Sequence, residues 1–420
     1  MTFASRHSVF AQEIFDHIRR MSVDGPGVTR QGYSDLETNV LHYLIDLGQE
    51  FGMEVQTDGA GNVWLTLPGV DRSKPAIVSG SHVDSVPRGG NFDGLAGAVA
   101  ALCVARRFAQ RGRTPAVDYR VLLLRCEESS FFGKAYVGSL GMMGRLTEKD
   151  LSLKHRSKRL TLGQAMQAQG VDLSVVQNGQ PSVDLTKIGA FIELHIEQGP
   201  TLTSQDKSTV GIVTGIRGNI RHKKVRCLGE TAHSGAVNKE YRHDAVMAVC
   251  EFLHTMENHW QAWLEMGHDL VFTTGVLKTN ATAAISVIPG EVEMTMDIRS
   301  LKKETLRLFH ALCQAEARRI ATKRGVKFEW DPMLFTAPAT LTEEVENALE
   351  AAAQKAELSY MKLASGAGHD SAVFANAGVA TGMIFIANQN GSHNPYEAMR
   401  LEDFLLGAEL LWETVHNGMA

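Results

Sequence analysis

The sequence predicts an α/β fold in which a mostly parallel sheet carries helices on both faces and is interrupted by a small α+β domain. Short apolar runs alternate with amphipathic stretches along the first half of the chain, which favours a parallel sheet covered by helices. Near residue 214 the order of elements changes, and the alternation resumes near residue 331. The chain has 420 residues, which is enough for two domains. We expect one domain over residues 1–213 and 331–420, and an inserted domain over residues 214–330.

The first half of the chain supplies the main helices and most apolar runs of the large sheet. Residues 1 to about 60 are expected to form amphipathic helices, broken at residues 24–27 and ended near Gly52. A further helix is expected over residues 95–109, and residues 145–187 are polar and helix-prone. Buried strands are typically continuous apolar runs when helices cover both faces of the sheet. On this pattern we expect strands over residues 62–67, 75–78, 119–126 and 188–196.

The inserted domain shows a different rhythm. Its elements follow the order strand, helix, strand, strand, helix, strand, which is the split βαβ pattern of a ferredoxin-like domain. The strands are expected at residues 221–228, 271–277, 292–299 and 326–330, and the helices at residues 244–260 and 303–324. After the insertion, a helix at 343–356, a strand at 382–387 and a helix at 402–416 complete the large domain.

Composition excludes several classes of protein. Hydrophobic residues make up 44% and charged residues 21% of the chain, as in ordinary globular proteins, and the net charge of −5 gives no case for binding nucleic acid or an anionic membrane. The 5 cysteines form no C-x-x-C pair, which argues for a reducing compartment and against a disulfide framework. Residues 3–21 contain no signal-peptide core, and no apolar run is long enough for a membrane span. A cytoplasmic protein is expected.

A polar loop follows the apolar run at residues 75–78. His82 and Asp93 lie in this loop, at the carboxyl end of a predicted strand, where open α/β sheets bind ligands. An imidazole and a carboxylate suit a divalent metal ion, and Asp84 is placed to accept the other ring N–H of His82. The alternative is a solvated loop with a turn at residues 91–94.

Further metal-ligating side chains stand at or just beyond other predicted strand ends. Glu127 and Glu128 alone could be a solvated strand end, His195 a core histidine, and the segment around His393 a simple turn. Together with His82 and Asp93, they would all lie at one edge of one sheet. Two histidines, a bridging carboxylate, and a further carboxylate and histidine would hold two metal ions. A carboxylate beside the metals but not bound to them is a natural general base.

Six segments resemble the motifs of the hydantoinase/carbamoylase family of amidases. This family includes N-carbamoyl-L-amino-acid hydrolases, β-ureidopropionase and allantoate amidohydrolase, within the larger group of aminoacylase/carboxypeptidase-like metallohydrolases. The resemblance runs from about residue 80 to residue 400, in the order of the family. The segments are residues 80–86, 90–94, 127–129, 193–200, 365–370 and 392–397.

The resemblance implies a role for each candidate ligand. His82 and His195 would bind one metal, Glu128 and His393 would bind the other, and Asp93 would bridge them. Two further roles are implied, with Glu127 as the general base and proton shuttle and Asp84 as the second partner of His82. The metals would be Zn²⁺ or Mn²⁺, with Co²⁺ and Ni²⁺ as alternatives. The resemblance also implies a homodimer built through the inserted domain, whose closure brings residues of that domain over the metals.

Two residues of the inserted domain match substrate-handling positions of the family. His233 matches a histidine that stabilises the tetrahedral oxyanion, and Arg299 matches an arginine that binds a substrate carboxylate. Each has a structural alternative. His233 could only pack a turn, and Arg299 could pair with Asp297 or Glu293 on a strand surface.

The remaining substrate positions include departures from the family. Gln198 matches a substrate-contacting glutamine, and His369 falls in a motif of the same pocket. The family usually carries two asparagines before the strand of the arginine, and here these positions are Ala283 and Ser286. The loop after the family histidine also differs, at residues 236–238. No expected metal ligand is changed, so these departures concern the substrate and leave the metal chemistry intact.

The sequence therefore predicts hydrolysis of a linear amide or ureido C–N bond in a small carboxylate-bearing molecule. An N-carbamoyl-amino acid, giving an amino acid, ammonia and carbon dioxide, is the leading expectation. Allantoate and an N-acyl amino acid are the alternative substrates. A catalytically silent dimeric scaffold or binder is the alternative from another class, and retention of Glu127 beside all the expected ligands argues against it.

Overall fold

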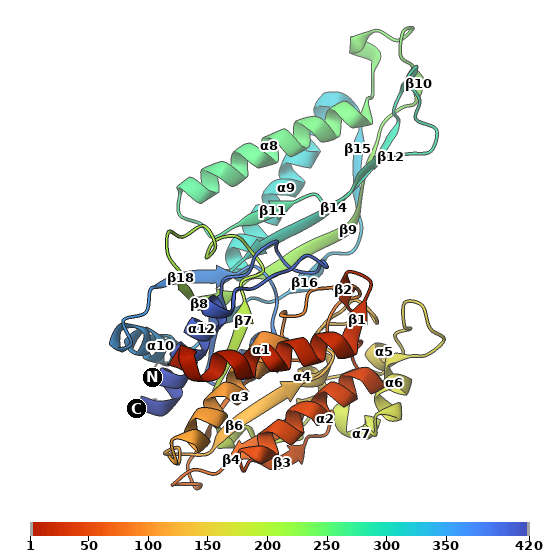
Figure 1. Cartoon of the computed structure of the whole chain (residues 1–420). Helices are drawn as coiled ribbons and strands as arrows, with labels where there is room; N and C mark the ends of the chain where they lie inside the picture. Colours follow the sequence, from red (N-terminus) through yellow and green to blue (C-terminus); the bar gives the residue numbers. More distant parts are fainter. Residues whose placement is uncertain (1–2, 418–420) are drawn as a thin grey trace. The chain divides into compact units, whose positions relative to one another are not determined.

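Figure 1 shows the computed structural model of the chain, which describes residues 3–417. The chain divides into two compact units, a large unit of residues 1–214 and 340–420 and an inserted unit of residues 215–339. The second boundary therefore lies beyond the expected residue 330. The reason is that β16 (Leu334–Thr336) pairs antiparallel with β9 (Gly218–Leu228), which keeps residues 331–339 with the inserted unit.

The large unit is built on a nine-stranded sheet in the order β17-β8-β19-β7-β5-β6-β4-β3, with β18 paired to β8. Its four central strands are mutually parallel, since β5 pairs in parallel with β6 and β7, and β19 pairs in parallel with β7. The bordering strands β8 and β4 run antiparallel to β19 and β6. The strands are β3 (Glu54–Thr57), β4 (Val63–Leu67), β5 (Ala76–His82), β6 (Tyr119–Leu124), β7 (Ile188–Ile196), β8 (Val210–Ile216), β17 (Ala339–Thr340), β18 (Tyr360–Ser365) and β19 (Thr381–Ile386).

Helices bury both faces of this sheet. Successive residues of β6 alternate between two hydrophobic cores, with Val121 and Leu123 in one and Leu122 and Leu124 in the other. This arrangement explains the continuous apolar run in the sequence. The first core contains residues of α1 (Phe3–Ser22), α2 (Asp35–Glu50), α3 (Leu95–Gln110), α10 (Glu343–Lys355) and α12 (Leu401–Asn417). The second contains residues of α4 (Val137–Met142), α5 (Glu148–Leu151), α6 (Leu162–Ala168), α7 (Leu173–Val176) and α11 (Asp370–Ala375).

The inserted unit has a six-stranded sheet in the order β11-β14-β9-β15, with β12 paired to β14 and β16 to β9. Numbered along the split βαβ pattern, this is the order 2-3-1-4 with helices α8 and α9 packed on it, as predicted. The expected strand at residues 271–277 is instead two short strands, β11 and β12, that pair with different parts of β14. The elements are α8 (Ala245–Glu265), β11 (Val271–Thr273), β12 (Leu277–Thr279), β14 (Glu291–Ser300), α9 (Lys303–Arg324) and β15 (Lys327–Trp330).

Several short elements complete the two units. They are β1 (Val23–Asp24), β2 (Gly27–Val28), β10 (Ala232–His233), β13 (Val287–Ile288) and the 3-10 turns at Leu185–Lys187 and Lys239–Tyr241. Within residues 3–417, the helices are all too short or too polar to cross a lipid bilayer.

Candidate active site

The predicted metal ligands of the large unit meet at the carboxyl ends of the central strands. His82 is the last residue of β5, His195 lies at the end of β7, and Glu128 follows β6. His393 lies in the loop after β19, and Asp93 stands just before α3. Because these strands are parallel and adjacent, their carboxyl ends meet at one edge of the sheet.

Asp93 lies between two groups of metal-ligating atoms. Its Oδ1 lies 3.1 Å from His195 Nε2 and 3.4 Å from His82 Nε2. Its Oδ2 lies 3.5 Å from His393 Nε2, and that nitrogen lies 3.1 Å from Glu128 Oε1. Within each group the possible ligand atoms are all within 4.8 Å of one another. Two donor sets that share one carboxylate fit a pair of divalent metal ions.

Contacts at Nδ1 orient both buried histidines, His82 and His195, so that the Nε2 atom of each ring faces Asp93. Asp84 Oδ1 lies 3.3 Å from His82 Nδ1, and the backbone carbonyl of Ile196 lies 2.8 Å from His195 Nδ1. A proton on Nδ1 leaves the Nε2 lone pair available for a metal, which is the usual arrangement of metal-binding histidines. The donor set and these contacts together fit bound metal ions.

The charges of this cluster compensate one another. Burial lowers the pKa of His82, but hydrogen bonds to Asp84 and Asp93 outweigh burial and hold that pKa well above its ordinary value. Burial raises the pKa of Asp93, but the interactions with His195, His393 and His82 together outweigh burial and hold that pKa well below its ordinary value. Hydrogen bonds to Asp93 and Glu128 raise the pKa of His393 to about 11. Protons and metal ions compete for such ligands, so metal binding would release protons.

Glu127 is buried beside the two groups but belongs to neither. Burial raises the pKa of Glu127 well above its ordinary value, His82 opposes this, and the nearby Glu128 and Asp370 add to it. A carboxyl group with a raised proton affinity at a metal site has the chemistry of a general base and acid. Asp84 accepts hydrogen bonds from the backbone N–H groups of Glu127 at 2.9 Å and Glu128 at 3.1 Å, which ties this turn to His82.

Two predicted substrate residues of the large unit also lie in this cluster. Gln198 Nε2 donates a hydrogen bond to Asp93 Oδ2 at 2.8 Å, and its buried Oε1 has no partner within the described part of the chain. The ring of His369 lies 4.5 Å from the ring of His195, edge to face, and its Nε2 lies 2.9 Å from Ser365 Oγ. Burial lowers the pKa of His369 well below its ordinary value, which favours the neutral form of this ring.

The other predicted substrate residues belong to the inserted unit. His233 is exposed on β10, and its Nδ1 accepts a hydrogen bond from the backbone N–H of Gly235 at 3.1 Å. Arg299 donates to Asp297 Oδ2 at 2.8 Å, the pairing that the sequence offered as an alternative. The carbonyl of Ser286 accepts a hydrogen bond from Ser234 at 2.9 Å, where β13 pairs with β10. The roles of His233, Ser286 and Arg299 stay predictions.

Two buried carboxylates near the site were not assigned a role from the sequence. Glu397 Oε1 accepts hydrogen bonds from the backbone N–H groups of Phe92 at 2.9 Å and Asp93 at 3.3 Å, and burial and Asp93 raise the pKa of Glu397 to about 7. Burial and Glu193 raise the pKa of Asp370 to about 7. The sequence signal for both was their position in the motifs that contain His393 and His369.

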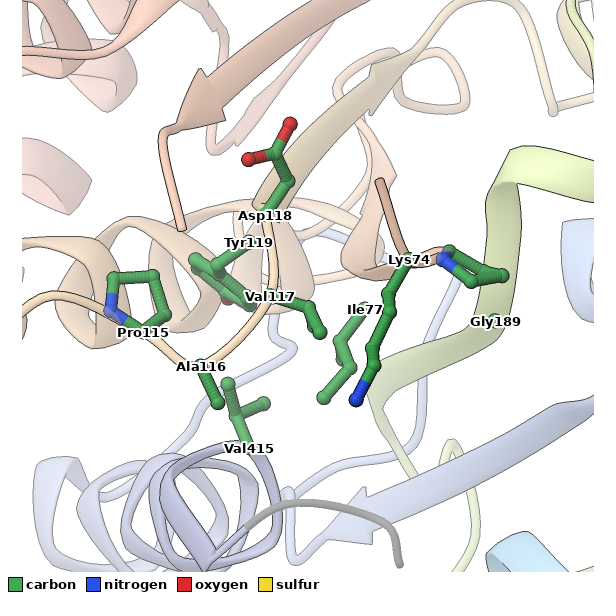
Figure 2. A pocket seen from close by; sticks show the side chains of 10 residues that line it. Lys74, Ile77, Pro115, Ala116, Val117, Asp118, Tyr119, Gly189 and Val415 are labelled. Carbon is green, nitrogen blue, oxygen red and sulfur yellow. The ribbon is translucent and has the colours of Figure 1, made fainter. Parts of the chain in front are cut away.

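A pocket lies at the other end of the same strands (Figure 2). Ile77, Tyr119 and Gly189 line it, near the amino ends of β5, β6 and β7. Figure 2 shows the carboxylate of Asp118 turned away from the pocket. No predicted ligand lines this pocket, so it is separate from the site at the carboxyl ends.

The fold and the site define a class of hydrolase with a two-metal donor set at the carboxyl edge of a mostly parallel sheet. The chain belongs to the peptidase family M20/M25/M40, because the sequence model of that family matches residues 78–417. Enzymes of this family generally depend on two metal ions.

Three known proteins show how far the similarity extends. The N-carbamoyl-L-amino-acid amidohydrolase of Paenarthrobacter aurescens is 30% identical over 412 residues, covering 98% of both chains. The allantoate amidohydrolase of Bacillus subtilis is 31% identical over 397 residues, covering 94% of this chain and 93% of that protein. The crystal structure of a hydantoinase/carbamoylase family amidase from Burkholderia multivorans superimposes with a TM-score of 0.89 at 27% identity, covering 98% of this chain and 97% of that one.

Proposed function

We propose that this protein is a metal-dependent amidohydrolase that cleaves an N-carbamoyl-amino acid to the amino acid, ammonia and carbon dioxide. The observation that carries the proposal is the pair of donor groups around Asp93 with the unligated carboxylate of Glu127 beside them. The similarity to an N-carbamoyl-L-amino-acid amidohydrolase over 98% of the chain supports the substrate class.

In this proposal His82 and His195 hold one metal ion, Glu128 and His393 hold the other, and Asp93 contacts both. We propose Zn²⁺ or Mn²⁺, since histidine and carboxylate ligands suit both ions. When bound, the ions would supply Lewis-acid polarisation of the substrate carbonyl and would lower the pKa of a water molecule.

The remaining residues act on protons, charge and substrate position. Glu127 accepts a proton from the attacking water and returns it to the departing nitrogen. His233 stabilises the negative charge that develops on the carbonyl oxygen, and Arg299 binds the substrate carboxylate as a bidentate donor. Gln198 and His369 complete the substrate contacts. Asp84 holds the ring of His82, and Ser286 replaces a family asparagine with a shorter donor.

Product analysis tests the proposal. Metal-replete protein is offered N-carbamoyl-amino acids, β-ureidopropionate, ureidoglycolate, allantoate and N-acyl amino acids, and released ammonia and free amine are measured. Ammonia together with a free amino acid is the expected result. Amine without ammonia would instead indicate an aminoacylase, and no turnover across the panel would contradict the proposed chemistry.

Allantoate is the second candidate substrate. The B. subtilis allantoate amidohydrolase is 31% identical over 94% of this chain, against 30% over 98% for the carbamoylase. The positions Ala283 and Ser286 depart from the family pattern. Ammonia released from allantoate alone would establish this candidate.

We also propose that the protein is a cytoplasmic homodimer assembled through the inserted unit. Residues of that unit would then act on a substrate bound by the large unit. Analytical ultracentrifugation of the full chain tests the assembly, since a monomer at all concentrations would contradict it.

A further inference from the structure

The turn that carries Glu127 and Glu128 begins with an unusual backbone. Cys126 has a φ of 50°, in the left-handed region that residues with a side chain rarely adopt. Such backbones persist only where surrounding contacts hold them, and they concentrate at functional sites. The contacts that hold Cys126 therefore bear on the position of the two glutamates that follow it.

The backbone carbonyl of Cys126 accepts a hydrogen bond from the backbone N–H of Val137 at 3.0 Å, and a buried carboxylate on α2 holds its N–H. Glu37 is 0% exposed, and its Oε1 accepts a hydrogen bond from the backbone N–H of Cys126 at 3.0 Å. Its Oε2 accepts bonds from Arg125 Nε and from the backbone N–H of Tyr33, both at 2.7 Å. Tyr33 is itself left-handed, with a φ of 52°, and the Arg125 guanidinium lies over its ring at 4.8 Å. One carboxylate thus holds two left-handed residues and a buried guanidinium.

The same turn is held from the metal side by Asp84. The backbone N–H groups of Glu127 and Glu128 both donate to its carboxylate. The hydrogen bonds that the described residues donate to the Glu37 carboxylate come instead from Tyr33, Arg125 and Cys126. Glu37 and Asp84 therefore fix two successive parts of one turn, and the side chains of Glu127 and Glu128 extend from it.

We infer that Glu37 is a positioning residue for the reaction, because its carboxylate fixes the Arg125–Cys126 turn and so sets where Glu127 and Glu128 stand. The inference rests on the proposed function for the roles of those glutamates. It goes beyond an effect on stability, because a displaced turn would move a proton-transferring group and a metal ligand together.

A matched control exists at the other end of the same strand. Asp118, just before β6, is also a buried carboxylate that accepts a backbone N–H, from Gly69 at 2.8 Å, and a guanidinium, from Arg72 Nε at 3.2 Å. Glu37→Gln and Asp118→Asn each replace a carboxylate by an amide and remove one ion pair. Glu37 acts on the end of β6 that carries the site, and Asp118 acts on the opposite end.

We expect Glu37→Gln to lower kcat by about 10–100-fold, with KM changed by less than about threefold, and Asp118→Asn to keep kcat within about twofold. Both are compared as folded protein, checked by thermal unfolding. Equal kcat values for the two variants would overturn the inference. If Glu37→Gln does not fold, Glu37→Asp replaces it, and a kcat equal to that of the unmodified protein would overturn the inference.

Calorimetric titration of the metal-free proteins with Mn²⁺ separates this inference from the proposed function. We expect Glu37→Gln to bind at least one Mn²⁺ ion about tenfold more weakly than Asp118→Asn, because Glu128 moves with the turn. This result would support the inference even if the unmodified protein hydrolysed none of the proposed substrates. In that case, equal Mn²⁺ affinities of the two variants would overturn it.

Discussion

Glu127 and Glu128 are neighbours in the chain but stand in different surroundings. Glu128 Oε1 lies 3.1 Å from His393 Nε2, within one of the two donor groups, whereas Glu127 lies outside both. Burial raises the pKa of Glu127 well above its ordinary value. These surroundings fit the proposed roles, which are proton transfer for Glu127 and metal binding for Glu128.

We predict that Glu127→Gln lowers kcat by about 10²–10⁴-fold, because the amide cannot carry the proton. Metal content, measured by elemental analysis after gel filtration, is expected to stay at the level of the unmodified protein. Glu128→Gln is the matched control and is expected to lose metal as well as activity. If Glu127→Gln turned over substrate at the rate of the unmodified protein, Glu127 would be excluded as the general base.

Asp370 links the site to the pH dependence of stability. Burial and Glu193 raise its pKa in the folded chain to about 7, against an ordinary value of 3.8. The folded state therefore holds a proton that the unfolded state has lost between these pH values. This contribution is fully present below about pH 4 and is lost as the pH rises through about 7.

We predict that Asp370→Asn removes this dependence. Relative to the variant, the metal-free unmodified protein should lose stability between pH 4 and pH 7 by up to about 1.4 kcal/mol per pH unit. Urea unfolding across this range measures the difference. A constant difference between the two proteins would show that Asp370 titrates normally.

At the scale of elements, helix α3 has a glycine next to each end, and the two glycines differ in the space around them. Gly94 precedes the helix with a φ of 69°, and a Cβ there would stand 2.4 Å from the ring of His82. Gly112, just past the other end, has a φ of 57° and open space around it. The start of α3 is therefore fitted around a proposed metal ligand.

We predict that Gly94→Ala weakens metal binding by about tenfold or more, because the added methyl group must displace the ring of His82. Gly112→Ala is the control, and it should cost about 1 kcal/mol of stability from the left-handed backbone while keeping metal affinity. Mn²⁺ titration and urea unfolding measure the two effects. Equal metal affinity in both variants would contradict a tight fit around His82.

The elements also show what could be predicted from the sequence. The apolar runs led to β5, β6, β7 and β19, because strands buried on both faces carry few polar residues. Strand β8 and the end of the insertion were missed, since their pairing with distant strands leaves little local pattern.

In the candidate site, too, some residues could be predicted from the sequence and others could not. Histidines and carboxylates at strand ends are recognisable as metal ligands from residue type alone. Glu37 is different, because Ser34 and Glu37 have the spacing of an ordinary helix start, and Glu37 N–H does donate to Ser34 Oγ at 3.3 Å. Its role depends on the backbone N–H groups of Tyr33 and Cys126, which sequence patterns do not bring together.

At the scale of the whole molecule, all the proposed metal ligands belong to the large unit, and the inserted unit has its own hydrophobic core. A ligand that binds only the folded state stabilises the region that holds it. Metal ions should therefore stabilise the two units unequally.

We predict that removing metal with EDTA speeds hydrogen exchange at the carboxyl ends of β5 and β7 and at the start of α3. Exchange in β9 and β14 of the inserted unit should change far less. Mass spectrometry of the full chain with and without Mn²⁺ makes this comparison. An equal acceleration in both units would contradict the assignment of all ligands to the large unit.

The strand order has a consequence for biosynthesis. In the finished sheet β19 stands between β7 and β8, although β7 and most of β8 precede the insertion in the chain and β19 follows it. A nascent chain that has reached residue 214 already contains His82, Asp93 and His195. It still lacks β19, the strand that pairs with both β7 and β8. The ribosome must first add the whole inserted unit. Only then do β19 and His393 close the centre of the sheet and complete the second donor group.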